Sequence, residues 1–131
     1  MPTRNIPVGD AGPRAADVML REPRAVPPVT TVREARETFE NPRVRLLLVA
    51  EGERFLGAVT REHVGHGVDG DATLGALVAG STLVRPEEPV TRVVELLDAE
   101  QSDRLPVVDD GGRLVGLVCF NRKHGHFCVD A

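Results

Sequence analysis

Residues Arg104–Cys119, RLPVVDDGGRLVGLVC, decide the fold because a near copy of them stands earlier in the chain. The copy is Arg45–Thr60, RLLLVAEGERFLGAVT. Each stretch has two apolar runs around a polar, glycine-containing turn, which predicts a β-hairpin. Seven of the 15 positions from 45 to 59 are identical to those from 104 to 118. The chain therefore contains an internal repeat.

The repeat extends upstream of each hairpin. A short extended segment, RAVPP at 24–28 or TLVRP at 82–86, precedes a predicted helix in both copies. In the first copy Thr31 and Glu34 fit a capping box, and in the second copy Pro89 suits a helix start. Each copy thus predicts strand, helix, strand, strand. Such a unit is too small to bury its own sheet, so two copies should pack together with pseudo-two-fold symmetry.

The predicted fold class is α+β, with two two-layer β-α-β-β(-α) repeats. We expect a flexible N-terminal leader at residues 1–14, because this stretch is rich in Pro and Gly and lacks periodicity. The first repeat is placed at 15–66. The second repeat is placed at 67–131 and ends in an atypical C-terminal hairpin.

Composition and net charge argue against several classes of function. The net charge of −4 and the aromatic content of 3% argue against nucleic-acid binding, which uses basic patches and stacking rings. No apolar stretch is long enough for a membrane span, so we expect no membrane partner. The two cysteines are too few for a disulfide framework. These features predict a cytoplasmic protein.

The segments LLLVAEGERFLGAVTREHV and LPVVDDGGRLVGLVCFNR, each after a strand and a helix, resemble the tandem CBS-domain family, also called the Bateman module. The resemblance covers roughly residues 15–123. It implies a stand-alone regulatory module that is not an enzyme and needs no cofactor. It also implies an adenine nucleotide, such as AMP or ATP, in clefts between the repeats. Members usually form homodimers and act on a regulated protein, which is unknown here.

Nucleotide sites of this family resemble a Gly-apolar-apolar-Thr/Ser-x-x-Asp pattern. The hydroxyl reaches phosphate or ribose, and the carboxylate accepts hydrogen bonds from the ribose hydroxyls. Residues 57–63 read GAVTREH, so Thr60 keeps the hydroxyl and His63 stands where Asp is expected. Arg61 is placed to meet a phosphate, and Val26 would line the adenine. The alternatives are a helix N-cap for Thr60 and a core position for Val26.

The second repeat departs further from the pattern. Residues 116–122 read GLVCFNR, so Cys119 replaces the hydroxyl and Arg122 replaces the carboxylate. Val84 would line the adenine or belong to the core. Both ribose carboxylates are absent, which predicts weak nucleotide binding. The first repeat is the favoured site because Thr60 keeps the hydroxyl and Arg61 could meet a phosphate. The implied ligand-binding residues are Val26, Thr60, Arg61, His63, Val84, Cys119, Asn121 and Arg122; no catalytic or metal-ligating residue is assigned.

The last residues, CFNRKHGHFCVDA, lack the helical periodicity that the family shows at this point. We predict a β-hairpin over Val118–Val129 that pairs Cys119 with Cys128. Phe120 and Phe127 should then share one face and the cysteines the other. Three interpretations are open: a packed apolar strand, a Cys119–Cys128 disulfide or redox switch, and a Zn²⁺ site from both cysteines with His126 or His124.

Two functional hypotheses compete most closely. One is a ligand-sensing module that acts through a population shift. The other is a structural or protein-interaction module that binds no nucleotide, which the missing carboxylates favour. Thiol or metal chemistry at the tail is a third and weaker interpretation, because no nucleophile–base order, phosphate loop or carboxylate pair stands out.

Overall fold

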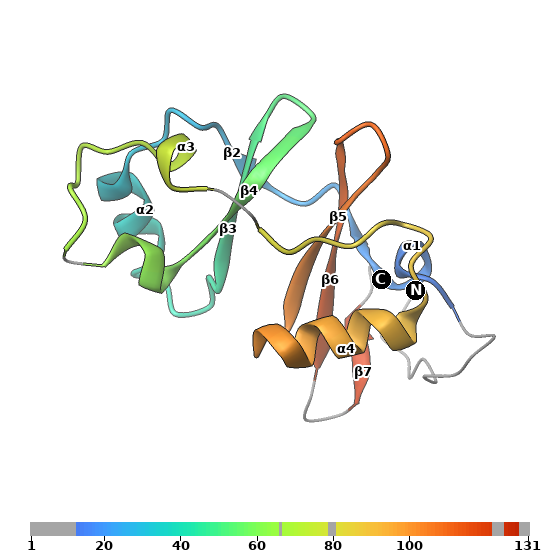
Figure 1. The fold of residues 1–131 in the computed structure, drawn as a ribbon. Coiled ribbons are helices and arrows are strands. Elements are labelled where there is room, and N and C mark those ends of the chain that lie inside the picture. The colour runs from blue at the N-terminus through green and yellow to red at the C-terminus, as the bar shows by residue number, and fades with distance from the viewer. Residues whose placement is uncertain (1–12, 66, 79–80, 122–124, 129–131) are drawn as a thin grey trace. The chain divides into compact units, whose positions relative to one another are not determined.

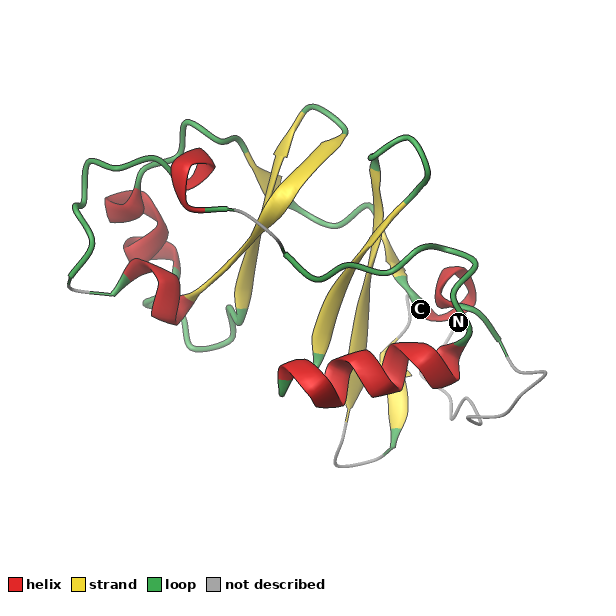
Figure 2. Cartoon of the chain, in the orientation of Figure 1, coloured by secondary structure: helices red, strands yellow, loops and turns green. Residues whose placement is uncertain are grey.

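The computed structural model describes residues 13–65, 67–78, 81–121 and 125–128. They form two compact units (Figure 1). The first, here the Thr60 unit, is Arg24–Ser81. The second, here the Cys119 unit, comprises the described parts of Met1–Pro23 and Thr82–Ala131. Both units mix helices with a sheet, as the sequence predicts (Figure 2).

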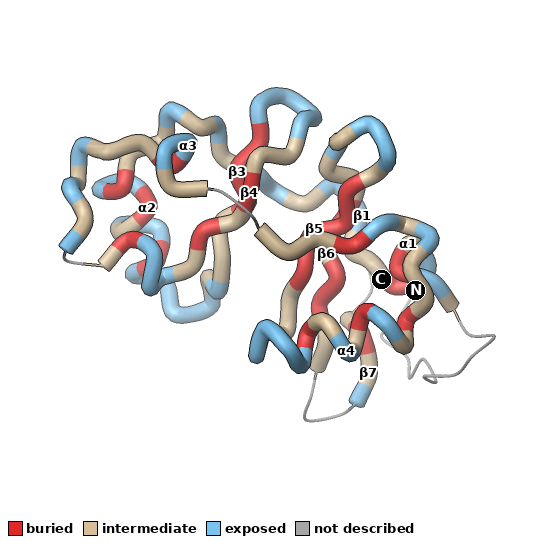
Figure 3. The backbone as a smooth tube through the Cα atoms, viewed as in Figure 1, coloured by how far each residue is buried: buried red, intermediate tan, exposed pale blue. Residues whose placement is uncertain are grey.

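The Thr60 unit has a three-stranded sheet in the order β2–β3–β4. Its strands are β2 (Ala25–Val26), parallel to β3 (Leu46–Glu51), which is antiparallel to β4 (Arg54–Thr60). Its helices are α2 (Val32–Thr38), the 3₁₀ helix η1 (Arg61–Val64) and α3 (Leu74–Leu77). The buried residues that form its core are Val32, Ala35, Phe39, Val49, Val59, Val64 and Leu74 (Figure 3).

The Cys119 unit has a four-stranded sheet centred on β6 (Leu114–Asn121). Strand β5 (Arg104–Val108) pairs with one edge of β6. The other edge carries both β1 (Leu20–Arg21) and β7 (His126–Cys128). Its helices are α1 (Ala15–Val18) and α4 (Val90–Glu100), and its core is Ala15, Val18, Val84, Val90, Val93, Leu97, Leu105, Val107, Val118 and Phe127.

Local predictions from the sequence are confirmed in the turns of both hairpins and at the start of α2. Gly52 and Gly112 have φ values of 62° and 83°, in the left-handed region that turns require and glycine tolerates. At the start of α2, Glu34 N–H donates to Thr31 Oγ1 over 3.2 Å, and Thr31 N–H donates back to Glu34 Oε1 over 3.0 Å. The predicted capping box is therefore present.

The second extended segment, 82–86, differs from its counterpart. The first segment forms β2, but the second contributes a single parallel bridge between Val84 and Val107. Val84 N–H donates to Pro106 O over 3.0 Å, and Val108 N–H donates to Val84 O over 2.9 Å. The prediction of a strand here is therefore reduced to one bridged residue.

The compact units are not the two sequence repeats. Helix α1 lies in the sequence of the first repeat, yet it belongs to the Cys119 unit, where Ala15 N–H donates to Glu88 O over 2.8 Å. Helix α3 lies within 67–131, yet it belongs to the Thr60 unit, where Leu74 N–H donates to Thr30 O over 2.8 Å. The compact units therefore differ from the repeats expected at 15–66 and 67–131 in the placement of α1 and α3.

The units differ from the repeats because α1 and α3 each pack on the sheet that the other repeat forms. Gly57 in β4 and Gly116 in β6 occupy equivalent repeat positions. A Cβ on Gly57 would lie 2.5 Å from Val78 Cβ, directly after α3, and a Cβ on Gly116 would overlap Met19, directly after α1. Only glycine allows these segments to approach the strands so closely.

The expected leader also ends earlier than residue 14. Pro13 O accepts a hydrogen bond from Val90 N–H over 3.0 Å, and Arg14 Nη1 donates to Glu87 O over 2.7 Å. Both residues thus hold the start of α4. Residues 1–12 lie outside the described residues. No helix in the described ranges is long and apolar enough to cross a membrane.

Candidate functional site

The turn after β4 brings together three of the predicted site residues. Strand β4 ends at Thr60, whose backbone is extended, and η1 starts at Arg61. Thr60 N–H donates to His63 Nδ1 over 2.9 Å, and Thr60 Oγ1 lies 3.2 Å from the same nitrogen. Thr60 therefore occupies the N-cap position, which was the structural alternative to a ligand-binding role.

His63 takes the place that a carboxylate holds at two other helix starts. Thr31 N–H donates to Glu34, three residues later, and Arg14 N–H donates to Asp17 over 2.8 Å. At Thr60 the same backbone donor meets an imidazole nitrogen. Accepting that bond requires an unprotonated Nδ1, so the ring proton resides on Nε2. The missing Asp is thus compensated structurally, but the ring offers a ligand a donor and no second acceptor.

Arg61 is held by the end of α2. Its Nη2 donates to Phe39 O over 2.9 Å, to Asn41 O over 3.4 Å and to Val44 O over 3.1 Å. Its guanidinium lies 5.3 Å from the centroid of the Phe39 ring, within cation–π range. A positive group at these carbonyls also complements the helix dipole. The guanidinium is therefore fixed in orientation.

The charge of Arg61 has no ion-pair partner among the described residues. The carbonyls that hold it are neutral, and no carboxylate oxygen of the described chain lies within 4.0 Å of it. Arg61 Nε and Nη1 make no hydrogen bond within that part of the chain either. A fixed guanidinium with unused donors is suited to an anion such as phosphate.

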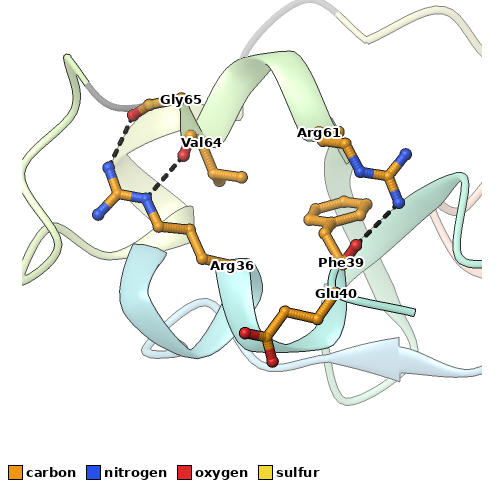
Figure 4. A pocket seen from close by; sticks show the side chains of 6 residues that line it. All are labelled: Arg36, Phe39, Glu40, Arg61, Val64 and Gly65. Carbon is orange, nitrogen blue, oxygen red and sulfur yellow. Dashed lines mark hydrogen bonds between the residues drawn. The ribbon is translucent and has the colours of Figure 1, made fainter. Parts of the chain in front are cut away.

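A hollow of about 280 Å³ opens beside this turn (Figure 4). Arg61 and the Phe39 ring lie on one side of it, and Arg36 lies on the other. Arg36 donates from Nε to Val64 O over 2.8 Å and from Nη2 to Gly65 O over 2.7 Å. The hollow is lined by Arg36, Phe39, Glu40, Arg61, Val64 and Gly65. It is at the lower limit of ligand pockets, which suits part of a nucleotide rather than all of it.

The sequence did not indicate Arg36 or Phe39 as site residues. Phe39 is the C-cap residue of α2, and its burial is that of an ordinary core residue. Arg36 lies in the last turn of α2, where a basic side chain is common. Neither position carries a motif, and only the return of the chain through 61–65 brings them to the hollow.

Val26 is not brought to the turn. It lies in β2, and β3 separates β2 from β4 in the sheet. Its side chain is half-buried and packs against the core of the Thr60 unit. This packing agrees with the core alternative for Val26, and a contact with adenine stays a prediction.

The corresponding residues of the second repeat form no equivalent turn. Val84 is 2% exposed and lies in the core, so its side chain lines no open surface of the Cys119 unit. Cys119 and Asn121 lie in β6, whose backbone pairs with β7. Arg122 lies outside the described residues. Because the strand continues where the first repeat starts a helix, the predicted second site has a different local geometry.

The predicted C-terminal hairpin is confirmed. Strands β6 and β7 pair Cys119 with Cys128, Phe120 with Phe127, and Asn121 with His126. The two phenyl rings are 4.9 Å apart between centroids, and Phe127 is fully buried. The two Sγ atoms are 3.2 Å apart.

The metal interpretation finds no support at the hairpin. No group of three His, Cys, Asp or Glu side chains within the described ranges could hold a metal ion, and these ranges contain Cys119, His126 and Cys128. His124 lies outside the described residues.

Comparison with known proteins agrees with this geometry. The model of the CBS domain matches residues 15–65 and 81–121, which together cover most of the chain and both hairpins. The chain belongs to the CBS-domain family. The two matches fall on the two sequence repeats, so each CBS motif contributes its hairpin to one compact unit.

Similar proteins include an enzyme and two solved CBS-type structures. Inosine-5'-monophosphate dehydrogenase of Korarchaeum cryptofilum is 28% identical over 106 residues, which are 80% of this chain. The matched region is only 22% of the enzyme, so the chain spans about a fifth of the curated relatives that it matches.

Among solved structures, CBSX2 in complex with AMP is 25% identical with a TM-score of 0.69, over 82% of this chain and 90% of that one. Hypoxic Response Protein I, solved with two coordinated zinc ions, is 24% identical with a TM-score of 0.70, over 81% and 92% of the two chains. The latter likeness shows the fold alone.

Proposed function

We propose that the chain is a cytoplasmic regulatory CBS module that senses an adenine nucleotide or a related small ligand and acts through a partner protein. The observation that carries the proposal is the turn at Thr60, where the CBS hairpin is followed by a hydroxyl and by a fixed guanidinium that has no ion-pair partner among the described residues. The AMP bound to the similar CBSX2 supports the choice of ligand class. The regulatory step would be a shift between conformations that bind the ligand unequally.

We place the ligand in the Thr60 unit. Arg61 would meet the phosphate through Nε and Nη1, because Nη2 is already engaged by carbonyls. Thr60 would offer its hydroxyl, and the hollow beside Phe39 would receive the part of the ligand nearest Arg61. The Cys119 unit presents a paired strand at the equivalent position, so it is the weaker candidate.

Binding should be weak for this family because of His63. A carboxylate can accept hydrogen bonds from both ribose hydroxyls, whereas a neutral imidazole has one acceptor nitrogen. In this structure that nitrogen already accepts from Thr60 N–H. An Asp at 63 could make the same capping contact, as Asp17 does for Arg14, and still present a second oxygen.

The test is calorimetry with a panel of AMP, ADP, ATP and S-adenosylmethionine on the wild type and on His63→Asp. We expect weak binding of at least one nucleotide, tightened by the substitution by about tenfold, which corresponds to one additional charge-assisted hydrogen bond. Cys128→Ser, in the other unit, is the matched control and should bind like the wild type. If the wild type binds tightly and His63→Asp weakens binding, the argument from the missing carboxylate is wrong.

The second candidate is a CBS module that binds no nucleotide. The same hydrogen bonds favour it, because His63 and Arg61 have structural roles at a helix start and a helix end. Absence of heat with the whole panel, for both the wild type and His63→Asp, would select this candidate.

We further propose a homodimer, on the basis of the family alone, because the apolar residues of α2 and α4 are already buried within their own units. Light scattering at micromolar concentration measures the mass directly. A monomer that does not associate as the concentration is raised would refute the dimer without affecting the ligand proposal.

A further inference from the structure

The hairpin of β6 and β7 holds two thiols in direct opposition. Cys119 and Cys128 are register partners in an antiparallel pair, and their Sγ atoms are 3.2 Å apart. Partner residues in such a pair have Cβ atoms about 4.5–5.5 Å apart, close to the range that a disulfide spans. The sulfur atoms need to approach by only about 1 Å to reach the bonded distance.

Neither thiol belongs to the core cluster of the Cys119 unit. Phe127, next to Cys128 on β7, does belong to that cluster. The position of Cys119 corresponds to Thr60 in the first repeat, which is the N-cap residue of η1. The second repeat has instead a thiol with another thiol across the strand.

We propose that Cys119 and Cys128 form a reversible disulfide when the protein meets a peroxide, so that the C-terminal hairpin is an oxidation site separate from the proposed ligand site. This proposal does not depend on nucleotide binding.

The two thiols have different exposure, which assigns their order of reaction. Cys128 is half-buried, whereas Cys119 is 8% exposed. Burial, together with the hydrogen bond to Cys128, raises the pKa of Cys119 to about 11. The thiolate is the reactive form, so Cys128 is the sulfur that meets the oxidant and Cys119 is the resolving thiol.

The chemistry balances with hydrogen peroxide as the oxidant. The Cys128 thiolate attacks one peroxide oxygen, the O–O bond breaks, and the departing hydroxide takes up a proton to give water. The resulting sulfenic acid is attacked at sulfur by Cys119, so that the S–S bond forms, the S–O bond breaks and a second water leaves. Two thiols lose two electrons and two protons, and one peroxide is reduced to two waters. A small dithiol reverses the reaction by exchange.

The disulfide would attach the short strand β7 covalently to β6. Strand β7 has three residues and is joined to β6 by three register pairs. Its Phe127 is nonetheless fully buried, so separation of β7 from β6 would open the core. A bond from Cys119 to Cys128 limits that opening, and we expect it to raise the Tm by about 5 °C.

The experiment uses the full chain, reduced and then freed of reductant. Titration with a thiol reagent under denaturing conditions should find two thiols before hydrogen peroxide, none after it, and two again after dithiothreitol. Intact mass should fall by two hydrogens with no change in oligomeric mass. In Cys119→Ser the reaction should stop at sulfenic acid on Cys128, which dimedone traps, and neither Cys119→Ser nor Cys128→Ser should gain the rise in Tm.

Three outcomes would overturn the proposal: both thiols stay titratable, the loss is not restored by dithiothreitol, or the bond joins two chains. Where a serine variant fails to fold, the titration and mass of the wild type decide alone. A nucleotide-binding result, positive or negative, leaves this conclusion unchanged because the ligand residues lie in the Thr60 unit.

Discussion

In the Thr60 unit, the second strand of the hairpin is followed directly by the helix η1. In the Cys119 unit, the second strand instead continues to Asn121 and pairs with the additional strand β7. The two hairpins are otherwise near copies. In the first, His63 provides an acceptor for Thr60 N–H, which stabilises a helix start. In the second, Phe120 and Phe127 alternate with the cysteines and continue the sheet. The comparison shows that a few residues after two similar hairpins decide whether the chain forms a helix or continues the sheet.

The helices that precede the two hairpins, α2 and α4, also differ in how they end. Helix α2 ends at carbonyls that receive the Arg61 guanidinium. The equivalent position in the Cys119 unit is Phe120, and α4 has the C-cap Gln101, whose φ of 51° is left-handed. In the Thr60 unit, the residue after the hairpin therefore also stabilises the end of the preceding helix.

The largest expected effect concerns β7. Phe127→Ala should lower the free energy of unfolding by about 3–5 kcal/mol, because it removes a fully buried ring from the core of the Cys119 unit. Denaturant unfolding measures the change. Val29→Ala, at a side chain that is 73% exposed, is the control and should change stability by less than about 0.5 kcal/mol. An equally small change for Phe127→Ala would show that β7 is not a structural part of its unit.

An intermediate effect concerns the end of α2. Arg61→Ala should cost about 1–2 kcal/mol, because it removes the donor to three carbonyls and the contact with the Phe39 ring. Thermal unfolding followed by circular dichroism measures it. Arg54→Ala, at an exposed arginine of the same unit, should have little effect. Equal stability of the two variants would mean that Arg61 does not cap α2.

The smallest expected effect is a pH-dependent change in stability from Asp109, which lies in the turn of the second hairpin. Asp109 Oδ1 accepts from Gly111 N–H and Arg113 N–H, both over 2.9 Å. The bond from Arg113 N–H is the main cause that lowers the pKa of Asp109 below its usual value, and desolvation opposes it. The charge of Arg113 and the bond from Gly111 N–H add to the lowering. A lowered folded pKa stabilises the fold above the pKa of the unfolded chain, and the contribution disappears as the pH falls through the folded pKa.

Asp109→Ala should therefore lower the Tm at neutral pH and have a progressively smaller effect in acid. Thermal scans from neutral pH to about pH 3 cover the range in which ordinary Asp side chains titrate. Asp110→Ala, at the next residue of the same turn, is the control and should show no such pH dependence. A pH-independent difference between wild type and Asp109→Ala would contradict the role of the ionised carboxylate.

Much of the fold was predictable because its determinants are local. The two hairpins follow from apolar runs around glycine turns, and the capping box at Thr31 follows from residues three apart. The C-terminal hairpin was predicted from alternation over Val118–Val129, and its register of Cys119 with Cys128 is confirmed. The reduced strand at 82–86 was not predictable, because its length depends on pairing with β5 rather than on its own residues.

The candidate site was predictable only in part. The resemblance to the CBS family indicated Thr60, Arg61 and His63, which lie together at the start of η1. It did not indicate that Nδ1 of His63 is engaged by the backbone or that Arg61 is held by the end of α2. The Arg61 contacts join residues about 20 positions apart, and no spacing rule encodes them. The His63 contact spans three residues, which is the spacing of a capping box, but it joins a backbone donor to an imidazole in place of the usual carboxylate or amide.

The sequence by itself determined the doubled hairpin and the divergence after Thr60 and Cys119, because periodicity and capping act over a few residues. Only the tertiary structure decided that α1 joins the Cys119 unit and α3 joins the Thr60 unit. Each of these four-residue helices is too short to be stable alone and must bury its apolar side chains on a sheet. Gly57 and Gly116 open the space for that burial, and which segment fills it depends on the path of the whole chain.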